Sequence, residues 1–95
     1  MAIYLDREGV ENVVAKIVTA VEALEEAAGQ VDSQMMGELG SYWQGNSYDK
    51  VILTYEESYR EMLTKTVPET VRELNNFIDK CKQAIVEVDQ QLSGN

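Results

Sequence analysis

The chain has 95 residues, with 17 Asp and Glu against 8 Lys and Arg, and a formal net charge of −9. A surface this acidic repels phosphates, so nucleic acid and anionic membrane surfaces are not expected partners. There is no histidine, which excludes histidine-based acid–base catalysis, Ser-His and Cys-His nucleophiles and His-ligated metal sites. We therefore expect no enzymatic activity, no metal and no cofactor.

The length predicts a single domain spanning residues 1–95. A core of this size is marginal by itself, so a partner chain is expected. The first residues lack the cationic and apolar regions of a secretory signal peptide. No stretch approaches the ~20 apolar residues that cross a bilayer, so no membrane span is expected. If the protein leaves the cell, we expect export without a cleavable signal peptide.

An apolar stripe predicts a first helix over about residues 6–39. Asp6 is a good N-cap, and Leu5 and Val10 occupy the two positions of a hydrophobic staple. Gly40 is expected to end the helix in a left-handed conformation. The stripe consists of Val10, Val14, Ile17, Val21, Leu24, Ala28, Val31, Met35 and Leu39, and Val13 and Ala27 widen it.

A second stripe predicts a helix over about residues 47–92, with Asn46 as its N-cap. Glu56 and Arg60 are spaced to pair on its surface. Pro68 removes one hydrogen bond, but the stripe continues through it, so we expect a kink there and no helix end. The stripe consists of Ile52, Tyr55, Tyr59, Leu63, Val67, Val71, Leu74, Ile78, Cys81, Ile85, Val88 and Leu92.

The short connection over residues 40–46 predicts an antiparallel helix-turn-helix hairpin, which places the chain in the all-α class. Two helices alone enclose no core, and both stripes are wider than one seam between two helices. Each hairpin should therefore bury its remaining apolar face on another, and we expect a four-helix bundle formed by dimerisation.

Several residues that could carry chemistry are better explained structurally. The acidic group Glu22, Glu25 and Glu26 is expected to be a solvated face. Cys81 lies within the second stripe and is expected to be a buried, unreactive thiol. Gly29 interrupts the first helix and could allow close approach of another helix.

Trp43 lies in the turn, and two interpretations are open for it. Its ring could close the end of the hairpin, while Gly45 supplies a backbone conformation that only glycine tolerates. Alternatively, Trp43 could be a recognition anchor, because tryptophan is enriched at binding hot spots.

The Trp43-Gln44-Gly45 turn, at mid-chain between two long amphipathic helices of a small acidic protein, resembles the WXG family of early-secreted-antigen (ESAT)-like proteins. These proteins are exported by bacterial type VII (ESX) secretion. The resemblance implies an antiparallel four-helix bundle that is exported folded, with Trp43 and Gly45 as the turn motif of the export signal.

The family's C-terminal export signal, Tyr-x-x-x-Asp/Glu, is matched only in part. Asp89 fits the acidic position, but Ile85 stands where tyrosine is expected, and Leu92 completes a looser hydrophobic-acidic-hydrophobic pattern. The resemblance implies three kinds of partner: a second copy in a homodimer, a related hairpin protein or the helical domain of a larger effector in a heterodimer, and the type VII machinery. The alternative is a cytoplasmic structural or adaptor hairpin.

Overall fold

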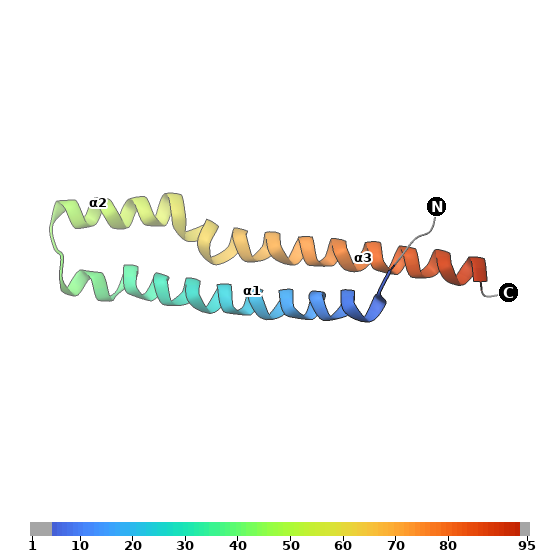
Figure 1. Ribbon diagram of the computed structural model, residues 1–95. Helices are drawn as coiled ribbons and strands as arrows, with labels where there is room; N and C mark the ends of the chain where they lie inside the picture. Colours follow the sequence, from blue (N-terminus) through green and yellow to red (C-terminus); the bar gives the residue numbers. More distant parts are fainter. Residues whose placement is uncertain (1–4, 94–95) are drawn as a thin grey trace.

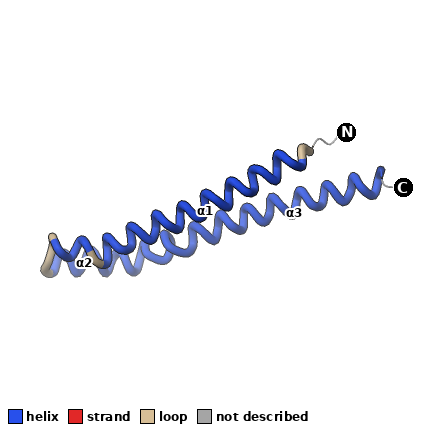
Figure 2. The backbone as a smooth tube through the Cα atoms, turned by 90° about the horizontal axis from the view of Figure 1, so that it is seen from below, coloured by secondary structure: helices blue, strands red, loops and turns tan. Residues whose placement is uncertain are grey.

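The computed structural model describes residues 5–93, with side chains for residues 5–88. It is a rod of 73 × 19 × 18 Å built from two antiparallel helical arms. One arm is α1 (Arg7–Met36), and the other runs from α2 (Asn46–Thr54) into α3 (Val67–Ser93) (Figures 1 and 2). No strand occurs within residues 5–93. The expected all-α helical hairpin is therefore confirmed.

α1 begins where its sequence predicts. Asp6 has an extended backbone, and its Oδ1 accepts a hydrogen bond from the Gly9 amide at 2.9 Å. This bond satisfies one of the amide groups left free in the first helical turn. Leu5 and Val10 line the same shallow groove at this end of the rod. The prediction of Asp6 as the N-cap is confirmed.

The end of α1 differs from the expected one. The helix stops at Met36, and the chain tightens into a 3₁₀ turn over Glu38–Ser41. The only positive φ among the described residues belongs to Gly45, so the prediction of a left-handed stop at Gly40 is wrong. Gly40 serves another purpose, because a Cβ atom there would lie 2.9 Å from the Tyr48 hydroxyl oxygen.

The N-cap of the second arm also differs from the one expected from the sequence. Asn46 is the first residue of α2, and the N-cap position is held by Gly45, with no side-chain hydrogen bond to the helix end. The Gly45 carbonyl accepts the first helical bond from the Asp49 amide at 3.0 Å. Gly45 takes the capping position because its φ of 108° lets the chain reverse directly into the helix.

Two π-helical turns, Tyr55–Tyr59 and Met62–Thr66, connect α2 to α3, where the arm bends (Figure 1). The second turn ends two residues before Pro68, which offers no amide to the Thr64 carbonyl and crowds it. A widened turn accommodates this missing bond. Tyr55 and Pro68 are both buried. The wide π turns between them bring the stripe residue Tyr55, and not Thr54 two heptads before Pro68, to the side that faces α1.

Replacing Pro68 with alanine is expected to leave the free energy of unfolding nearly unchanged or to raise it by up to ~1.5 kcal/mol. The substitution restores a helical hydrogen bond and removes a clash worth ~3 kcal/mol. It also removes the buried ring methylenes, at ~0.8 kcal/mol for each CH₂. Urea unfolding at fixed protein concentration measures the balance, and a loss of several kcal/mol would show that the proline ring itself holds α3 in place.

The seam between the arms is narrow. Its buried positions are Val21 and Ala28 on α1, and Pro68, Asn75 and Lys82 on α3. The Asn75 Nδ2 donates to the Val14 carbonyl at 3.3 Å, and its Oδ1 is buried without a partner among the described residues. Polar groups in a helix seam cost stability but specify the register of the two helices. The single hairpin therefore buries little apolar surface.

Much of both predicted stripes is consequently exposed in the single hairpin. Cys81 is exposed, so the prediction of a buried thiol is wrong for the isolated chain. The reason is geometrical: the buried seam of α3 passes through positions 75 and 82, which leaves positions 74 and 81 beside it. The large exposed apolar residues of the two stripes are Leu24, Val31, Tyr59, Val67, Leu74 and Val88.

Candidate functional site

Trp43 and its neighbours form the tip of the hairpin. The Trp43 indole Nε1 donates to the Ser47 hydroxyl oxygen at 3.0 Å. Its ring lies 6.4 Å from the Tyr48 ring, with the two planes tilted by 53°. These contacts hold the indole in one orientation, although 40% of Trp43 remains exposed. Trp43 is therefore both a structural part of the turn and a feature of the surface.

An open cavity of about 490 Å³ lies beside the Trp43 ring, between the end of α1 and the start of the second arm. Its wall is mostly apolar and carries one cation, Lys50. A concave apolar surface with few polar groups is typical of binding sites. The lining residues are Met35, Trp43, Ser47, Lys50, Val51, Thr54, Tyr55 and Tyr59. Met35 also lines a second groove, with Leu39 and the highly exposed Tyr42.

Gly45 makes this tip possible. Its φ of 108° and ψ of −172° lie in a region that is essentially open to glycine alone. The Trp-x-Gly spacing thus has a physical basis in this chain, because the residue two positions after Trp43 must reverse the backbone and start α2.

The substitution Gly45→Ala is expected to destabilise the fold by ~1–3 kcal/mol, the usual cost of a side chain in this backbone region. Gly29→Ala is the matched control, because a Cβ atom at Gly29 meets nothing within 4 Å. Gly29 lies inside α1, so the control should gain up to ~1 kcal/mol. Equal changes in the two denaturation midpoints would contradict this account.

A polar cluster near the tip joins the two arms. The Tyr55 hydroxyl donates to Asp32 Oδ1 at 2.6 Å, and Arg60 binds both oxygens of the same carboxylate at 2.9 and 3.1 Å. The predicted surface pair of Glu56 with Arg60 is wrong, because Arg60 reaches across to α1. Sequence reasoning expected Tyr55 in the second stripe but missed this cluster, because it depends on Asp32 and Arg60 meeting across the hairpin.

The Asp32 cluster makes stability depend on pH. The hydrogen bond from Tyr55, followed by that from Arg60, lowers the pKa of Asp32 below its ordinary value of 3.8. Because folding lowers this pKa, the ionised carboxylate stabilises the folded state at pH values above the pKa of Asp32 in the unfolded chain. This stabilisation is lost as the pH falls through the lower pKa of the folded state.

We expect wild-type melting temperature to fall between about pH 5 and pH 2, the range in which carboxylates titrate. Asp32→Asn should melt lower at neutral pH and lose less on acidification. Thermal melting at fixed concentration tests this, with Glu26→Gln on the solvated face of α1 as the control. If the melting temperature of Asp32→Asn falls as far on acidification as that of the wild type, Asp32 is not the group that makes stability depend on pH.

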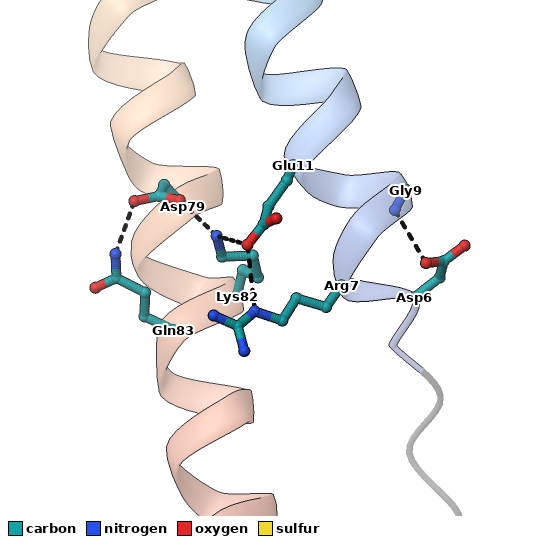
Figure 3. A network of polar contacts seen from close by, with 7 residues as sticks. All are labelled: Asp6, Arg7, Gly9, Glu11, Asp79, Lys82 and Gln83. Carbon is teal, nitrogen blue, oxygen red and sulfur yellow. Dashed lines mark hydrogen bonds and ion pairs between the residues drawn. The ribbon is translucent and has the colours of Figure 1, made fainter.

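A second network lies at the other end of the rod (Figure 3). The Lys82 side chain is largely buried, and its ammonium binds Glu11 at 3.3 Å and Asp79 at 3.0 Å, while Arg7 also binds Glu11. The hydrogen bond to Asp79 is the main cause that raises the pKa of Lys82 above its ordinary value. Burial acts in the opposite direction, and the hydrogen bond to Glu11 raises the pKa further. This network closes the seam where α1 starts and positions no nucleophile or acid–base pair.

The C-terminal residues of the predicted export signal lie far from Trp43 within one chain. Ile85 is half-buried on α3, near the open end of the hairpin. Asp89 and Leu92 belong to the last turns of α3, and their side chains lie outside the described residues. The structure therefore does not bring the turn motif and the C-terminal residues together within a single chain.

The acidic residues of α1 that were considered as ligands lie at the surface or form an ion pair between the arms. Glu25 forms an ion pair with Arg72 of α3, while Glu22 and Glu26 are exposed. Among residues 5–88, whose side chains the structure describes, no group of three metal-ligating side chains gathers at one place. Within residues 5–93, no helix is long and apolar enough to cross a membrane.

The fold and the tip define a helical hairpin whose glycine-dependent Trp-x-Gly turn presents a half-exposed indole beside an apolar cavity. Comparisons with protein families, with curated proteins and with solved structures find no match for this chain. The resemblance to the WXG family thus rests on the layout of the chain and on its turn.

Proposed function

We propose that the protein is a small, non-enzymatic interaction protein exported by a type VII secretion system. It would act either as a folded dimer or as the helical partner of a larger secreted effector. The observation that carries this proposal is the tip: Gly45 adopts a conformation reserved for glycine, and Trp43 is held rigidly beside an apolar cavity while two-fifths exposed.

The state of the Trp43 ring supports a recognition role. A tryptophan needed only to close the turn would gain most from complete burial, since large aromatic rings contribute most when buried. Trp43 instead keeps 40% of its surface accessible, with its polar N–H already satisfied by Ser47. A rigid, half-exposed aromatic group loses little conformational entropy on binding and makes a good anchor.

The exposed stripe residues support a partner chain. Val13, Leu24, Val67 and Leu74 are each between two-fifths and just over half exposed in the single hairpin. Contiguous apolar surface of this kind marks an interaction site in a protein that is otherwise strongly acidic. A dimer forming a four-helix bundle, or a helical domain of an effector, would cover it.

The alternative function is a cytoplasmic adaptor hairpin. The hydrogen bond from Trp43 to Ser47 and the contact with Tyr48 favour it, because both serve the turn itself. The two functions differ in where the protein is found. Expression in a bacterium with an active type VII system, with culture medium and cells assayed separately, distinguishes them.

A further inference from the structure

The cavity beside Trp43 is bounded by one face of α2 and by the end of α1. The lining residues of α2 and of its junction with the first π turn are spaced by three or four, which places them on one side of the helix. They are Ser47, Lys50, Val51, Thr54 and Tyr55. Met35, in the last turn of α1, lines the cavity from the other arm. The two arms therefore leave between them about 490 Å³ that the chain itself does not fill.

Two of the aromatic rings that line the cavity, those of Trp43 and Tyr55, offer it apolar surface. Their polar atoms are already bonded: Trp43 Nε1 donates to the Ser47 hydroxyl oxygen at 3.0 Å, and the Tyr55 hydroxyl donates to Asp32 at 2.6 Å. Arg60 binds both oxygens of that carboxylate, so the charge of Asp32 is balanced. An occupant of the cavity therefore meets mostly hydrocarbon and ring surface, which favours a ligand with an apolar body.

Lys50 is the charged residue among those that line the cavity. Its ammonium forms no ion pair with a carboxylate of residues 5–88, whereas Arg7, Arg60, Arg72 and Lys82 all form one. No acidic side chain lines the wall, although the chain has a net charge of −9. Charge complementarity at this cavity therefore favours a ligand that carries one anionic group.

We propose that the cavity binds a fatty acid, with the acyl chain against Met35, Val51 and Trp43 and the carboxylate paired with the Lys50 ammonium. The volume lies within the ~300–1,000 Å³ of small-molecule sites. An acyl chain asks for no hydrogen bond, which suits rings whose polar atoms are bonded elsewhere, and a single carboxylate matches a single cation. The inference goes beyond the proposed function, because binding of a fatty acid requires no secretion system.

Trp43 is the only tryptophan in the chain, so its fluorescence reports directly on the cavity. Titration of the purified protein with decanoate, below the concentration at which it forms micelles, should shift the Trp43 emission and saturate at one equivalent. Decyltrimethylammonium has the same apolar chain and the opposite charge, and it should bind more weakly at this site. No shift with decanoate, or equal binding of the cationic amphiphile, would overturn the proposal.

Lys50→Met tests the carboxylate contact, and Lys65→Met is its matched control. Both lysines are exposed, lie on the same arm and form no ion pair with residues 5–88, but Lys65 does not line the cavity. Lys50→Met should bind decanoate ~5-fold more weakly, as expected for a partly exposed ion pair, and decanol as tightly as the wild type does. Lys65→Met should leave both affinities unchanged.

Equal decanoate affinities in the two variants, or equal weakening of decanoate and decanol by Lys50→Met, would overturn the pairing with Lys50. The outcome is separable from that of the export proposal. A chain that reaches the culture medium but does not bind decanoate would overturn the fatty acid site alone, and a chain that binds decanoate but stays in the cells would overturn export alone.

Discussion

Replacing Trp43 with alanine is expected to abolish appearance of the protein in the culture medium while the purified protein stays helical and dimeric. The indole is held by Ser47 and Tyr48, and Trp43 is not one of the buried residues of the seam between the arms. Loss of a binding hot spot of about 2 kcal/mol weakens recognition ~30-fold. Immunodetection in medium and cells, with circular dichroism of the purified variant, measures both effects.

Tyr42→Ala is the control for Trp43→Ala. Tyr42 is the neighbouring aromatic residue, is 84% exposed and does not line the cavity beside Trp43. We expect its loss to leave export close to the wild-type level. If Trp43→Ala unfolds the protein, or if it is exported as efficiently as Tyr42→Ala, Trp43 is a structural closure of the turn and the export role is wrong.

Tyr55→Ala should produce the largest loss of stability of any single substitution considered for this chain. Tyr55 is 5% exposed and is the only aromatic side chain buried among the described residues. Truncating a buried aromatic ring costs ~3–5 kcal/mol, a large part of the ~5–15 kcal/mol that stabilises a typical domain. Denaturant unfolding at fixed protein concentration gives the value.

Tyr55→Phe separates the two roles of this residue. It keeps the buried ring and removes only the hydroxyl group that donates to Asp32. We expect a loss well below that of Tyr55→Ala, together with a weaker response to acid. If the two variants lose equal stability, the hydrogen bond to Asp32, and not burial of the ring, holds α2 against α1.

The sequence predicted the features that depend on local chemistry and helical periodicity. Asp6 caps α1 because a carboxylate before a helical stripe has free amides to bind. The two long stripes around a glycine-containing turn gave the antiparallel hairpin. Pro68 lies in the first turn of α3, which begins at Val67 directly after the second π turn, so the chain is helical on both sides of the proline.

The features missed from the sequence depend on register and on contacts across the hairpin. The two π turns interrupt the constant 3.6 residues per turn, which periodicity cannot show. Tyr55 was expected in the second stripe, but its bond to Asp32 and the reach of Arg60 to the same carboxylate were not. In α3, the stripe residue Cys81 lies beside the seam because Asn75 and Lys82, which are not part of the predicted stripe, occupy the seam itself.

At the candidate site, the sequence identified Trp43 and Gly45 but not their surroundings. The positive φ of Gly45 could be expected from a glycine in a tight turn. The cavity lined by Met35, Val51 and Tyr55 could not, because it forms only where α2 and the end of α1 meet at the tip. The bond from Trp43 to Ser47 likewise depends on α2 starting at Asn46, directly after Gly45.

Export of the unmodified protein is the measurement that tests the central proposal most directly. The chain is expressed in matched bacterial strains with an active and an inactivated type VII system, and medium and cells are assayed beside a cytoplasmic marker protein. The proposed function predicts that the protein accumulates in the medium of the first strain, well above the marker, and stays in the cells of the second. Retention in both strains at the level of the marker would contradict it and would make the protein a cytoplasmic helical hairpin.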